Sequence, residues 1–238
     1  MSRPFKFKKF TIVQEQNAHK VGTDSMILGA WVSTGYNRIL DIGTGTGVLA
    51  LMMAQKNPTA TITAIEPQAQ NIQEAQINFQ NSPYSHRIMA VPAMLQDFSS
   101  LEKYDLIISN PPYFDQDYKA VNAARNQARH TDYLSIYDLY AHSVDLLAEN
   151  GRMAVVLPVH LIEKHLAIAE DEGLFAHRIL KHLDPEGFVK RYFIEYTREA
   201  IAEVPVTTLT VKDTQNRYSA AYIALTQDFH NKDLSATK

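Results

Sequence analysis

The stretch Asp41-Ile42-Gly43-Thr44-Gly45-Thr46-Gly47 follows a predicted strand and opens a predicted helix. In that setting Gly43 and Gly45 let the backbone turn tightly and approach a ligand, and Gly47 permits close contact between helix and strand. The spacing is G-x-G-x-G, unlike the dinucleotide pattern G-x-G-x-x-G, and an acid precedes it directly. A carboxylate there repels a pyrophosphate and suits an ammonium group. The stretch therefore predicts a ligand site at the carboxyl ends of parallel strands, and the alternative is a purely structural turn.

Short β-rich runs alternate with helix-like segments around this loop. Apolar runs such as ILDI and DLIIS show no polar alternation, as expected for strands that are buried on both faces. Strand–helix alternation implies right-handed crossovers, so it predicts an α/β fold with a doubly wound, mostly parallel sheet. The predicted strands are Arg38–Ile42, Thr61–Glu66, Arg87–Val91, Tyr104–Ser109 and Met153–Leu157. The predicted helices are Val48–Gln55, Pro67–Gln80 and Ile136–Leu147.

The pattern changes toward both ends of the chain. Beyond Gly173, strand-like runs predict an antiparallel hairpin on one edge of the sheet. These runs are Arg191–Thr197, Thr207–Val211 and Ser219–Leu225. Near the N-terminus, Phe5 and Phe7 alternate with Lys6 and Lys8, which predicts a short strand with one apolar and one basic face. An edge strand guarded by lysines is favoured there over a nucleic-acid contact.

Length and composition indicate one large soluble domain. The chain has 238 residues, of which 45% are hydrophobic and 21% charged, enough for one α/β domain with a substantial core. It contains no cysteine, which excludes disulfides, thiolate metal sites and cysteine nucleophiles. The start MSRPFKFKKF lacks an apolar signal region and no run approaches the roughly 20 apolar residues of a membrane span, so a cytoplasmic location without a membrane partner is expected. We expect a monomer without a metal ion, and the net charge of −3 means that a polyanion must meet a local basic patch.

Two further carboxylates lie at the end of the next strand and after the one that follows it. Glu66 stands about 20 residues beyond the loop, where a carboxylate of such a fold accepts both ribose hydroxyls. Asp97 follows the third strand and can accept a hydrogen bond from an adenine amine, although a plain surface acid is the alternative. Together with Asp41 they would surround a nucleoside, and three carboxylates suit one that carries a cationic sulfonium.

This arrangement resembles the class I methyltransferase family from about Lys20 to Leu225. The resemblance implies a Rossmann-like, mostly parallel sheet of seven strands with an antiparallel C-terminal hairpin, and S-adenosyl-L-methionine as cofactor. It implies cofactor contacts from the following residues: Asp41, Gly43, Gly45, Gly47, Glu66, Pro67, Asp97 and Phe98. One departure is Glu66-Pro67-Gln68, because an aliphatic residue is commoner in the middle position. Pro67 can still pack on the adenine face.

The fourth strand ends in Ser109-Asn110-Pro111-Pro112-Tyr113, which matches the Asn-Pro-Pro-Tyr motif of amino-methyltransferases. An exocyclic aryl amine is a poor nucleophile because its lone pair is delocalised into the ring. The Asn110 side-chain oxygen and the Pro111 carbonyl can each accept one of its N–H groups and so aim the lone pair at the methyl group.

Pro111 and Pro112 restrict the backbone and remove competing donors, and Tyr113 offers a stacking face to a flipped base. Asn110 also belongs to the cofactor site that the resemblance implies. The alternative is a Pro-Pro turn that merely ends the strand. The same tetrapeptide serves methylation of glutamine amides in proteins, so the motif indicates the chemistry more firmly than the substrate.

Several observations favour RNA as the substrate. The missing cysteine excludes the covalent route to C5 of pyrimidines, and the chain has no room for a DNA-recognition domain of some size. The segment Lys20–Ser25, with Phe10-Thr11-Ile12, is similar to the bacterial tRNA1(Val) adenine-N6-methyltransferase family, which methylates the adenine just 3′ of the anticodon, at position 37. In that family the segment borders the methionyl end of the cofactor, which implies a contact from Thr23. The alternative is that Thr23 or Ser25 only caps a helix.

Basic residues after the motif resemble the same family. Within RNQARH, from Arg125 to His130, the resemblance implies that Arg125, Arg129 and His130 meet phosphates near the flipped base, and the alternative is a solvated helix start. Another candidate RNA face contains Arg178, Lys181, Lys190, Arg191 and Arg198, offset by Asp184, Glu186 and Glu195.

The resulting hypothesis is a tRNA adenine-N6 methyltransferase that uses S-adenosyl-L-methionine. We expect an N-terminal extension whose helix packs on the cofactor site over 1–34, a methyltransferase domain over 35–230 and a polar tail over 231–238. The alternative is a protein-glutamine N5-methyltransferase that acts on release factors. That family normally has a separate N-terminal helical domain, and only some 35 residues precede the first strand of the sheet here. A non-enzymatic cofactor-binding module would require a broken Asn-Pro-Pro-Tyr motif, and the motif is intact.

Overall fold

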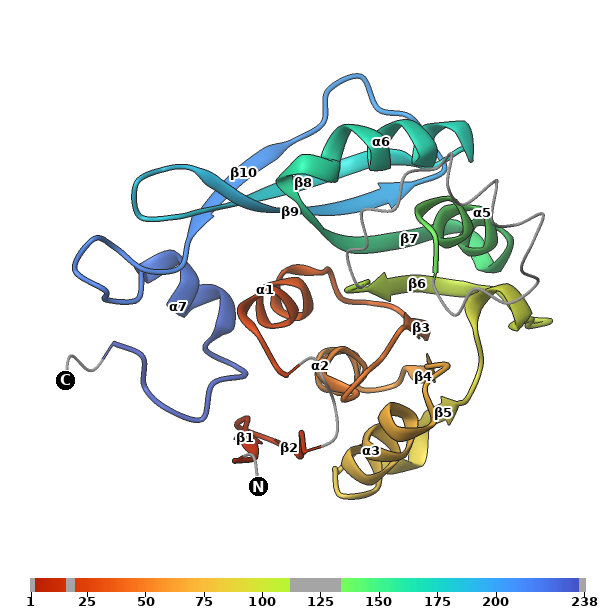
Figure 1. The fold of residues 1–238 in the computed structure, drawn as a ribbon, viewed down its shortest axis with the longest axis horizontal. Coiled ribbons are helices and arrows are strands. Elements are labelled where there is room, and N and C mark those ends of the chain that lie inside the picture. The colour runs from red at the N-terminus through yellow and green to blue at the C-terminus, as the bar shows by residue number, and fades with distance from the viewer. Residues whose placement is uncertain (1–2, 16–19, 112–133, 236–238) are drawn as a thin grey trace.

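The apolar runs that show no polar alternation form the centre of one large sheet, as the computed structural model shows for residues 3–15, 20–111 and 134–235 (Figure 1). In β3 (Arg38–Ile42), Ile39 packs into the core on one face of the sheet and Leu40 into the core on the other. In β6 (Tyr104–Ser109), Leu106 and Ile107 divide in the same way. Because successive side chains of a strand point to opposite faces, a strand covered on both faces needs an unbroken apolar run.

Among the described residues, the sheet has eight strands in the order β10-β8-β9-β7-β6-β3-β4-β5. Only β9 is antiparallel to its neighbours, and the other adjacent pairs are parallel. The predicted doubly wound, mostly parallel α/β fold is therefore confirmed, with one strand more than expected. The remaining strands are β4 (Thr61–Ile65), β5 (Ile88–Val91), β7 (Leu147–Pro158), β8 (Phe175–Leu183), β9 (Val189–Thr197) and β10 (Val206–Thr210).

Helices cover both faces of this sheet (Figure 1). One core cluster joins the sheet to α1 (Thr23–Trp31), α2 (Val48–Lys56), α3 (Ala69–Gln80) and α7 (Ala220–Thr226). The other joins it to α5 (Ile136–Leu146) and α6 (Ile162–Asp171). The predicted helices correspond to α2, α3 and α5, and their apolar faces supply the packing that stabilises them.

The C-terminal region differs from the prediction. The segment Ser219–Leu225, predicted as a strand, forms α7 instead. Ser219 caps the helix by accepting a hydrogen bond from Tyr222 N at 3.1 Å, and Tyr222 and Thr226 are buried one turn apart. The antiparallel partner of β9 is β8, which was not predicted because its mixture of basic and apolar residues shows no strand pattern. The predicted hairpin therefore exists with a different partner strand, and β10 pairs parallel to β8.

The N-terminal segment forms the predicted short strand. β1 (Phe5–Lys6) pairs antiparallel with β2 (Thr11–Ile12). Phe7 is buried and stacks on Phe10 with ring centroids 4.3 Å apart, while Lys6 and Lys8 are exposed. Within the described ranges, no helix is long and apolar enough to cross a bilayer.

Candidate active site

The predicted ligand-binding segments meet at one edge of the sheet. β3 lies between β4 and β6, and the three strands are parallel, so the loops that follow them leave at the same edge. The chain extends from β3 through β4 to β5 on one side and returns to β6 on the other side. This reversal is the topological switch point, where ligands of open α/β sheets bind.

The glycine-rich loop adopts the tight turn that its sequence predicts. Gly43, Gly45 and Gly47 have φ angles of +69°, +54° and +81°, a region that residues with a side chain rarely adopt. The N–H groups of Gly43 and Thr44 both donate to the Ile65 carbonyl, at 2.9 and 3.1 Å. A Cβ atom on Gly47 would stand 2.3 Å from the Phe79 ring, so glycine is also required for close packing of α3.

Asp41 lies fully buried beneath this loop. Its Oδ2 accepts hydrogen bonds from Thr44 Oγ1 at 2.5 Å and from Ala50 N at 3.1 Å. Burial raises the pKa of the Asp41 carboxyl to about 7, against the opposing effect of these two donors, and nearby Glu66 adds to the rise. Its buried Oδ1 has no hydrogen-bond partner in the part of the chain that the structure describes. This atom can accept from a cationic N–H donor, and such a donor would favour the ionised carboxylate.

Glu66 follows β4 and joins two loops. Its Oε2 accepts from Gly45 N at 3.1 Å, and its Oε1 accepts from Gln68 N at 3.1 Å and from Asn71 Nδ2 at 3.3 Å. Glu66 is buried, whereas Pro67 next to it is exposed. The carboxylate thus lies directly beside the glycine-rich loop, as the prediction of a ribose contact requires.

The next strand in the sheet, β5, leads to Asp97 and Phe98. Asp97 ends a short 3₁₀ helix (Leu95–Asp97) and is exposed, while Phe98 is half-buried with its ring centroid 6.5 Å from that of Tyr104. Both residues lie beyond the carboxyl end of a strand that pairs with β4. They therefore lie on the same edge as Glu66, and Asp97 is more open to solvent than the other two carboxylates.

Asn110 comes directly after β6, and a helix from the N-terminal region holds its side chain. Its Nδ2 donates to Ser25 Oγ of α1 at 3.0 Å, and Ser25 is buried. The preceding Ser109 donates its hydroxyl to the Ile42 carbonyl at 2.9 Å, which ties the end of β6 to the end of β3. Pro111 is buried. The other two motif residues, Pro112 and Tyr113, lie outside the described residues.

The structure at the start of α1 contradicts the alternative that Thr23 or Ser25 caps this helix. The residue at the N-cap is Gly22, and no side chain caps the helix. Thr23 is exposed, Asp24 forms an ion pair with Arg191 of β9 at 2.8 Å, and Ser25 turns inward to Asn110. The capping alternative for Thr23 and Ser25 is therefore wrong, and the segment instead joins α1 to β9 and to the residue after β6.

Sequence reasoning missed three polar residues that hold this region together. Thr44 bonds directly to Asp41 and Ser25 bonds directly to Asn110, although the sequence assigned no role to Thr44 and only a possible helix cap to Ser25. Asn78 of α3 donates to the Thr46 carbonyl at 2.8 Å and accepts from Val13 N at 2.8 Å, so it joins the glycine-rich loop to the N-terminal segment. The sequence signal that could have found it is its helical spacing with Ala75 and Phe79, which places a polar residue on the apolar face of α3.

Two of the five basic residues predicted as a candidate RNA face, Arg178 and Arg198, have structural roles. Arg178 forms an ion pair with buried Glu195 at 2.6 Å, and its guanidinium also bonds the Trp31 carbonyl at 3.0 Å. Arg198 donates to the carbonyls of Val144 and Leu147 at 2.5 and 3.2 Å. Both arginines thus link structural elements. Arg125, Arg129 and His130 lie outside the described residues.

The fold and the residues gathered at its switch point define a class I methyltransferase. A family model described as a methyltransferase small domain matches residues 18–174. Similar solved structures include a predicted O-methyltransferase from Agrobacterium tumefaciens, with a TM-score of 0.67 at 15% identity over 87% of this chain and 96% of that one. A methyltransferase from Pyrococcus furiosus has a TM-score of 0.52 at 22% identity, over 73% of this chain and 80% of that one. At such identities these likenesses concern the fold.

Relatives of similar length identify the family. A tRNA1(Val) (adenine(37)-N6)-methyltransferase from Parabacteroides distasonis is 42% identical over 98% of this chain and 100% of its own length. An enzyme of the same name from Trichodesmium erythraeum is 40% identical over 96% of this chain and 98% of its own. The chain belongs to the tRNA1(Val) (adenine(37)-N6)-methyltransferase family. The cofactor that these findings support is S-adenosyl-L-methionine. Among the described residues, no cluster of three or more His, Asp or Glu side chains could hold a metal ion.

Proposed function

We propose that this protein transfers a methyl group from S-adenosyl-L-methionine to N6 of adenine 37 in tRNA1(Val). The observation that carries the proposal is the position of Asn110, which follows β6 at the switch point and is oriented by Ser25. The names of the relatives, which match this chain over nearly its full length, supply the substrate. The alternative, methylation of a release-factor glutamine, is not favoured by these relatives.

In this proposal Asn110 and Pro111 bind the target amine. The amide nitrogen of Asn110 is engaged by Ser25, so the amide plane is oriented with Oδ1 on the opposite side. Oδ1 and the Pro111 carbonyl each accept one N–H of the adenine amine, which moves electron density back to nitrogen and aims its lone pair. Pro112 and Tyr113 complete the motif, with Tyr113 stacking on the base. No strong general base is needed, because the proton can leave after the new N–C bond has formed.

The cofactor is proposed to bind across the loops after β3, β4 and β5. It supplies an electrophilic methyl group on a sulfonium. Asp41 Oδ1, buried and available, accepts from the ammonium of its methionyl end, which Thr23 borders. Glu66 accepts from the ribose hydroxyls and Asp97 from the adenine amine. Pro67 and Phe98 flank the adenine ring, and Gly43, Gly45 and Gly47 let the backbone approach the ligand.

The same contacts support the domain limits that the sequence predicts. We propose that residues 1–34 form an extension whose helix α1 packs on the cofactor site, since Ser25 bonds Asn110 and Asn78 joins Val13 to the glycine-rich loop. Residues 35–230 form the methyltransferase domain and 231–238 the polar tail. We propose a cytoplasmic monomer that requires no metal. Arg125, Arg129 and His130 are proposed to meet the anticodon loop.

Glu66→Ala is expected to weaken binding of S-adenosyl-L-methionine by about 1–3 kcal/mol, because charge-assisted hydrogen bonds to the ribose are lost. Calorimetric titration of the purified protein measures this directly. Glu203→Ala removes an exposed carboxylate between β9 and β10 and serves as the control, with unchanged affinity expected. Equal affinities for wild-type protein and Glu66→Ala would remove Glu66 from the cofactor site.

The proposed function is tested with radiolabelled S-adenosyl-L-methionine and three acceptors in parallel: unmodified tRNA1(Val), duplex DNA and a release factor. A loop adenine is already unpaired, so a small enzyme can flip it at low cost, and label is expected in the tRNA only. A tRNA1(Val) transcript with guanine at position 37 should remain unlabelled. Label in the release factor alone would establish the glutamine alternative, and label in tRNA as a methylated guanine would contradict the adenine assignment.

A further inference from the structure

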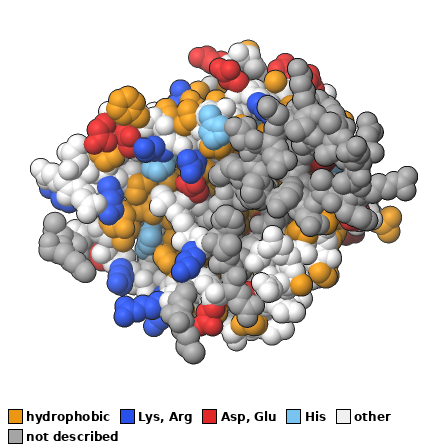
Figure 2. Space-filling model, viewed as in Figure 1, with side chains coloured by type: hydrophobic (Ala, Val, Ile, Leu, Met, Phe, Trp, Pro, Cys, Tyr) orange, Lys and Arg blue, Asp and Glu red, His pale blue; other side chains and the backbone are white. Residues whose placement is uncertain are grey.

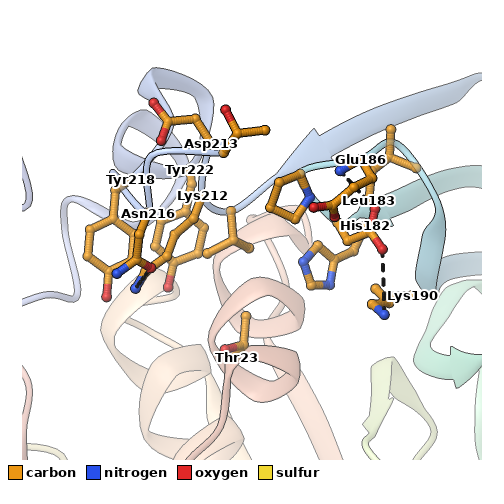
Figure 3. Close-up of a pocket in the computed structure, with 14 residues that line it drawn as sticks. Thr23, His182, Leu183, Glu186, Lys190, Lys212, Asp213, Asn216, Tyr218 and Tyr222 are labelled. Atoms are coloured by element: carbon orange, nitrogen blue, oxygen red, sulfur yellow. Dashed lines mark hydrogen bonds and ion pairs between the residues drawn. The ribbon is translucent and has the colours of Figure 1, made fainter.

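A cavity of about 570 Å³ lies between the turn that joins β8 to β9 and the loop that joins β10 to α7, and it has no role in the cofactor assignments above, apart from Thr23 on its wall. Figure 3 shows its two sides, with the β8–β9 turn on one and the β10–α7 loop on the other, and Thr23 at the start of α1 between them. The β8–β9 side contributes His182 and Lys190, and the other contributes Lys212 and Tyr218. The volume lies in the range of pockets that hold small organic ligands, including a nucleotide.

The topology places this cavity on the same edge of the sheet as Asn110. β8 runs antiparallel to β9, which runs antiparallel to β7, and β7 is parallel to β6. The ends of β8 and β10 that line the cavity are therefore carboxyl ends, like the end of β6 that leads to Asn110. Three strand spacings separate β8 from β6, roughly 14 Å at the usual 4.7–4.9 Å each.

Helix α1 connects the cavity to the active site. Thr23 lines the cavity, Asp24 bonds Arg191 of β9, and Ser25 bonds Asn110. Thr23, on the wall of the cavity, and Ser25, the hydrogen-bond partner of Asn110, are thus two positions apart in α1, which corresponds to about 3 Å of rise along the helix axis. A ligand in this cavity would therefore lie near a base held at Asn110.

Three carboxylates and two lysines line the cavity: Asp184, Glu186, Asp213, Lys190 and Lys212. Glu186 is exposed, and the Lys212 ammonium donates to Asn216 Oδ1 at 2.8 Å. Asp184 Oδ1 accepts from the backbone N–H groups of Glu186 and Phe188, at 3.1 and 2.8 Å. Asp213 accepts from the side chain of Arg217 at 2.9 Å and from its backbone N–H at 3.0 Å. Both carboxylates thus form hydrogen bonds within the turns that contain them. Lys190, by contrast, is 57% exposed and pairs only loosely with Asp184 at 3.5 Å.

Aromatic and imidazole groups complete the lining. The Tyr218 ring is 37% exposed and stacks on Tyr222 with centroids 5.4 Å apart, and Lys212 lies 5.0 Å from the Tyr218 centroid. A cation beside an exposed aromatic ring is a combination that binds single-stranded nucleic acid. In the described part of the chain, the buried Nδ1 of His182 has no hydrogen-bond partner, so the wall also offers a polar atom to a ligand.

Basic side chains continue from the cavity across this face of the molecule. Figure 2 shows Lys and Arg side chains spread over the half that carries β8, β10, α7 and β1. The connection is structural, because Tyr222 of the cavity contacts His230 at 3.2 Å and the Lys8 ammonium bonds the Gln227 carbonyl at 2.7 Å. These Lys and Arg side chains are the positive groups that this face offers to a polyanion, which a chain with a net charge of −3 must meet locally.

We infer that this cavity is a second RNA subsite, which holds an unpaired nucleotide near the target adenine. Lys190 and Lys212 receive its phosphates from opposite sides, and the Tyr218 ring packs on its base or ribose. The inference rests on the proposed function, since it places a further part of the same RNA substrate. The proposed subsite increases the affinity for the anticodon loop, and methyl transfer takes place at Asn110.

The test measures tRNA1(Val) binding and methylation by the full-length double variant Lys190→Gln/Lys212→Gln. The dissociation constant for tRNA is expected to rise about tenfold or more, and the slope of log K against log salt to fall by about 1.4–1.8 for two lost phosphate contacts. The single-turnover rate at saturating tRNA and the calorimetric affinity for S-adenosyl-L-methionine should stay within about twofold of wild type. Tyr218→Ala, which leaves the lysines intact, should weaken tRNA binding about tenfold with an unchanged salt slope.

Lys103→Gln is the matched control, because Lys103 is exposed at the amino end of β6, on the opposite edge of the sheet. Unchanged tRNA affinity in both cavity variants, with a wild-type enzyme that methylates tRNA, would overturn the subsite and leave the function intact. Equal losses in Lys103→Gln would overturn it as well, since the effect would then be one of net charge. A wild-type enzyme that neither binds nor methylates tRNA would overturn the proposed function and the subsite together.

Discussion

Replacement of Asn110 by alanine is expected to slow methyl transfer at least about a hundredfold while leaving the affinity for S-adenosyl-L-methionine nearly unchanged. The lost group is an acceptor whose hydrogen bond strengthens as the amine becomes nucleophilic, so its contribution appears in the transition state rather than in binding. Single-turnover assays with saturating tRNA measure the rate, and calorimetry measures the cofactor affinity. A rate loss of less than tenfold would contradict the role given to Asn110.

Ser25 provides a graded comparison for this prediction. Ser25→Ala keeps the Asn110 acceptor but removes the hydroxyl that orients it at 3.0 Å. A rate loss of about tenfold, equal to roughly 1.4 kcal/mol, is expected, with the cofactor affinity unchanged. Ser25→Thr retains a hydroxyl and should restore part of the rate. If Ser25→Ala instead lowered the melting temperature and left the rate at saturating substrates intact, Ser25 would be a structural residue only.

Gly47→Ala is expected to lower the free energy of unfolding by about 2–5 kcal/mol. Two costs combine, because a residue with a side chain at φ +81° is strained and its Cβ would stand 2.3 Å from the ring of Phe79, itself buried. Urea unfolding of the cofactor-free protein, followed by circular dichroism, measures the loss. Because the loop between β3 and α2 carries the glycines, weaker binding of S-adenosyl-L-methionine should accompany it.

Gly173→Ala is the matched control for that experiment. Its φ of +76° is nearly the same, and an added Cβ would have no neighbour within 4 Å, so only the backbone cost of about 1–2 kcal/mol applies. The difference between the two variants isolates the contact with Phe79. Equal losses at both positions would show that the packing of α3 against the loop tolerates the extra methyl group.

Local sequence patterns predicted the central strands and the helices α2, α3 and α5 because these signals depend on neighbours in the chain. Strands β3 and β6 were predicted with their observed limits, since an unbroken apolar run has few other structures in which to bury both faces. The C-terminal region lacked such a signal. In β8, basic and apolar residues are mixed without a regular alternation. The segment that forms α7 is short and apolar, and the periodicity of so short a segment does not distinguish a helix from a strand.

The sequence by itself determined the class of chemistry, because the glycine-rich loop and the tetrapeptide beginning at Asn110 are local signals whose meaning depends only on following a strand. The tertiary structure decided which residues, distant in the sequence, contact these two motifs. Ser25 lies 85 positions from Asn110 and Asp24 lies 167 positions from Arg191. Such pairs depend on strand order, on register and on the packing of α1 against the sheet, none of which a local pattern contains. The cavity between the β8–β9 turn and the β10–α7 loop arises in the same way, since its walls come from segments that only the fold brings together.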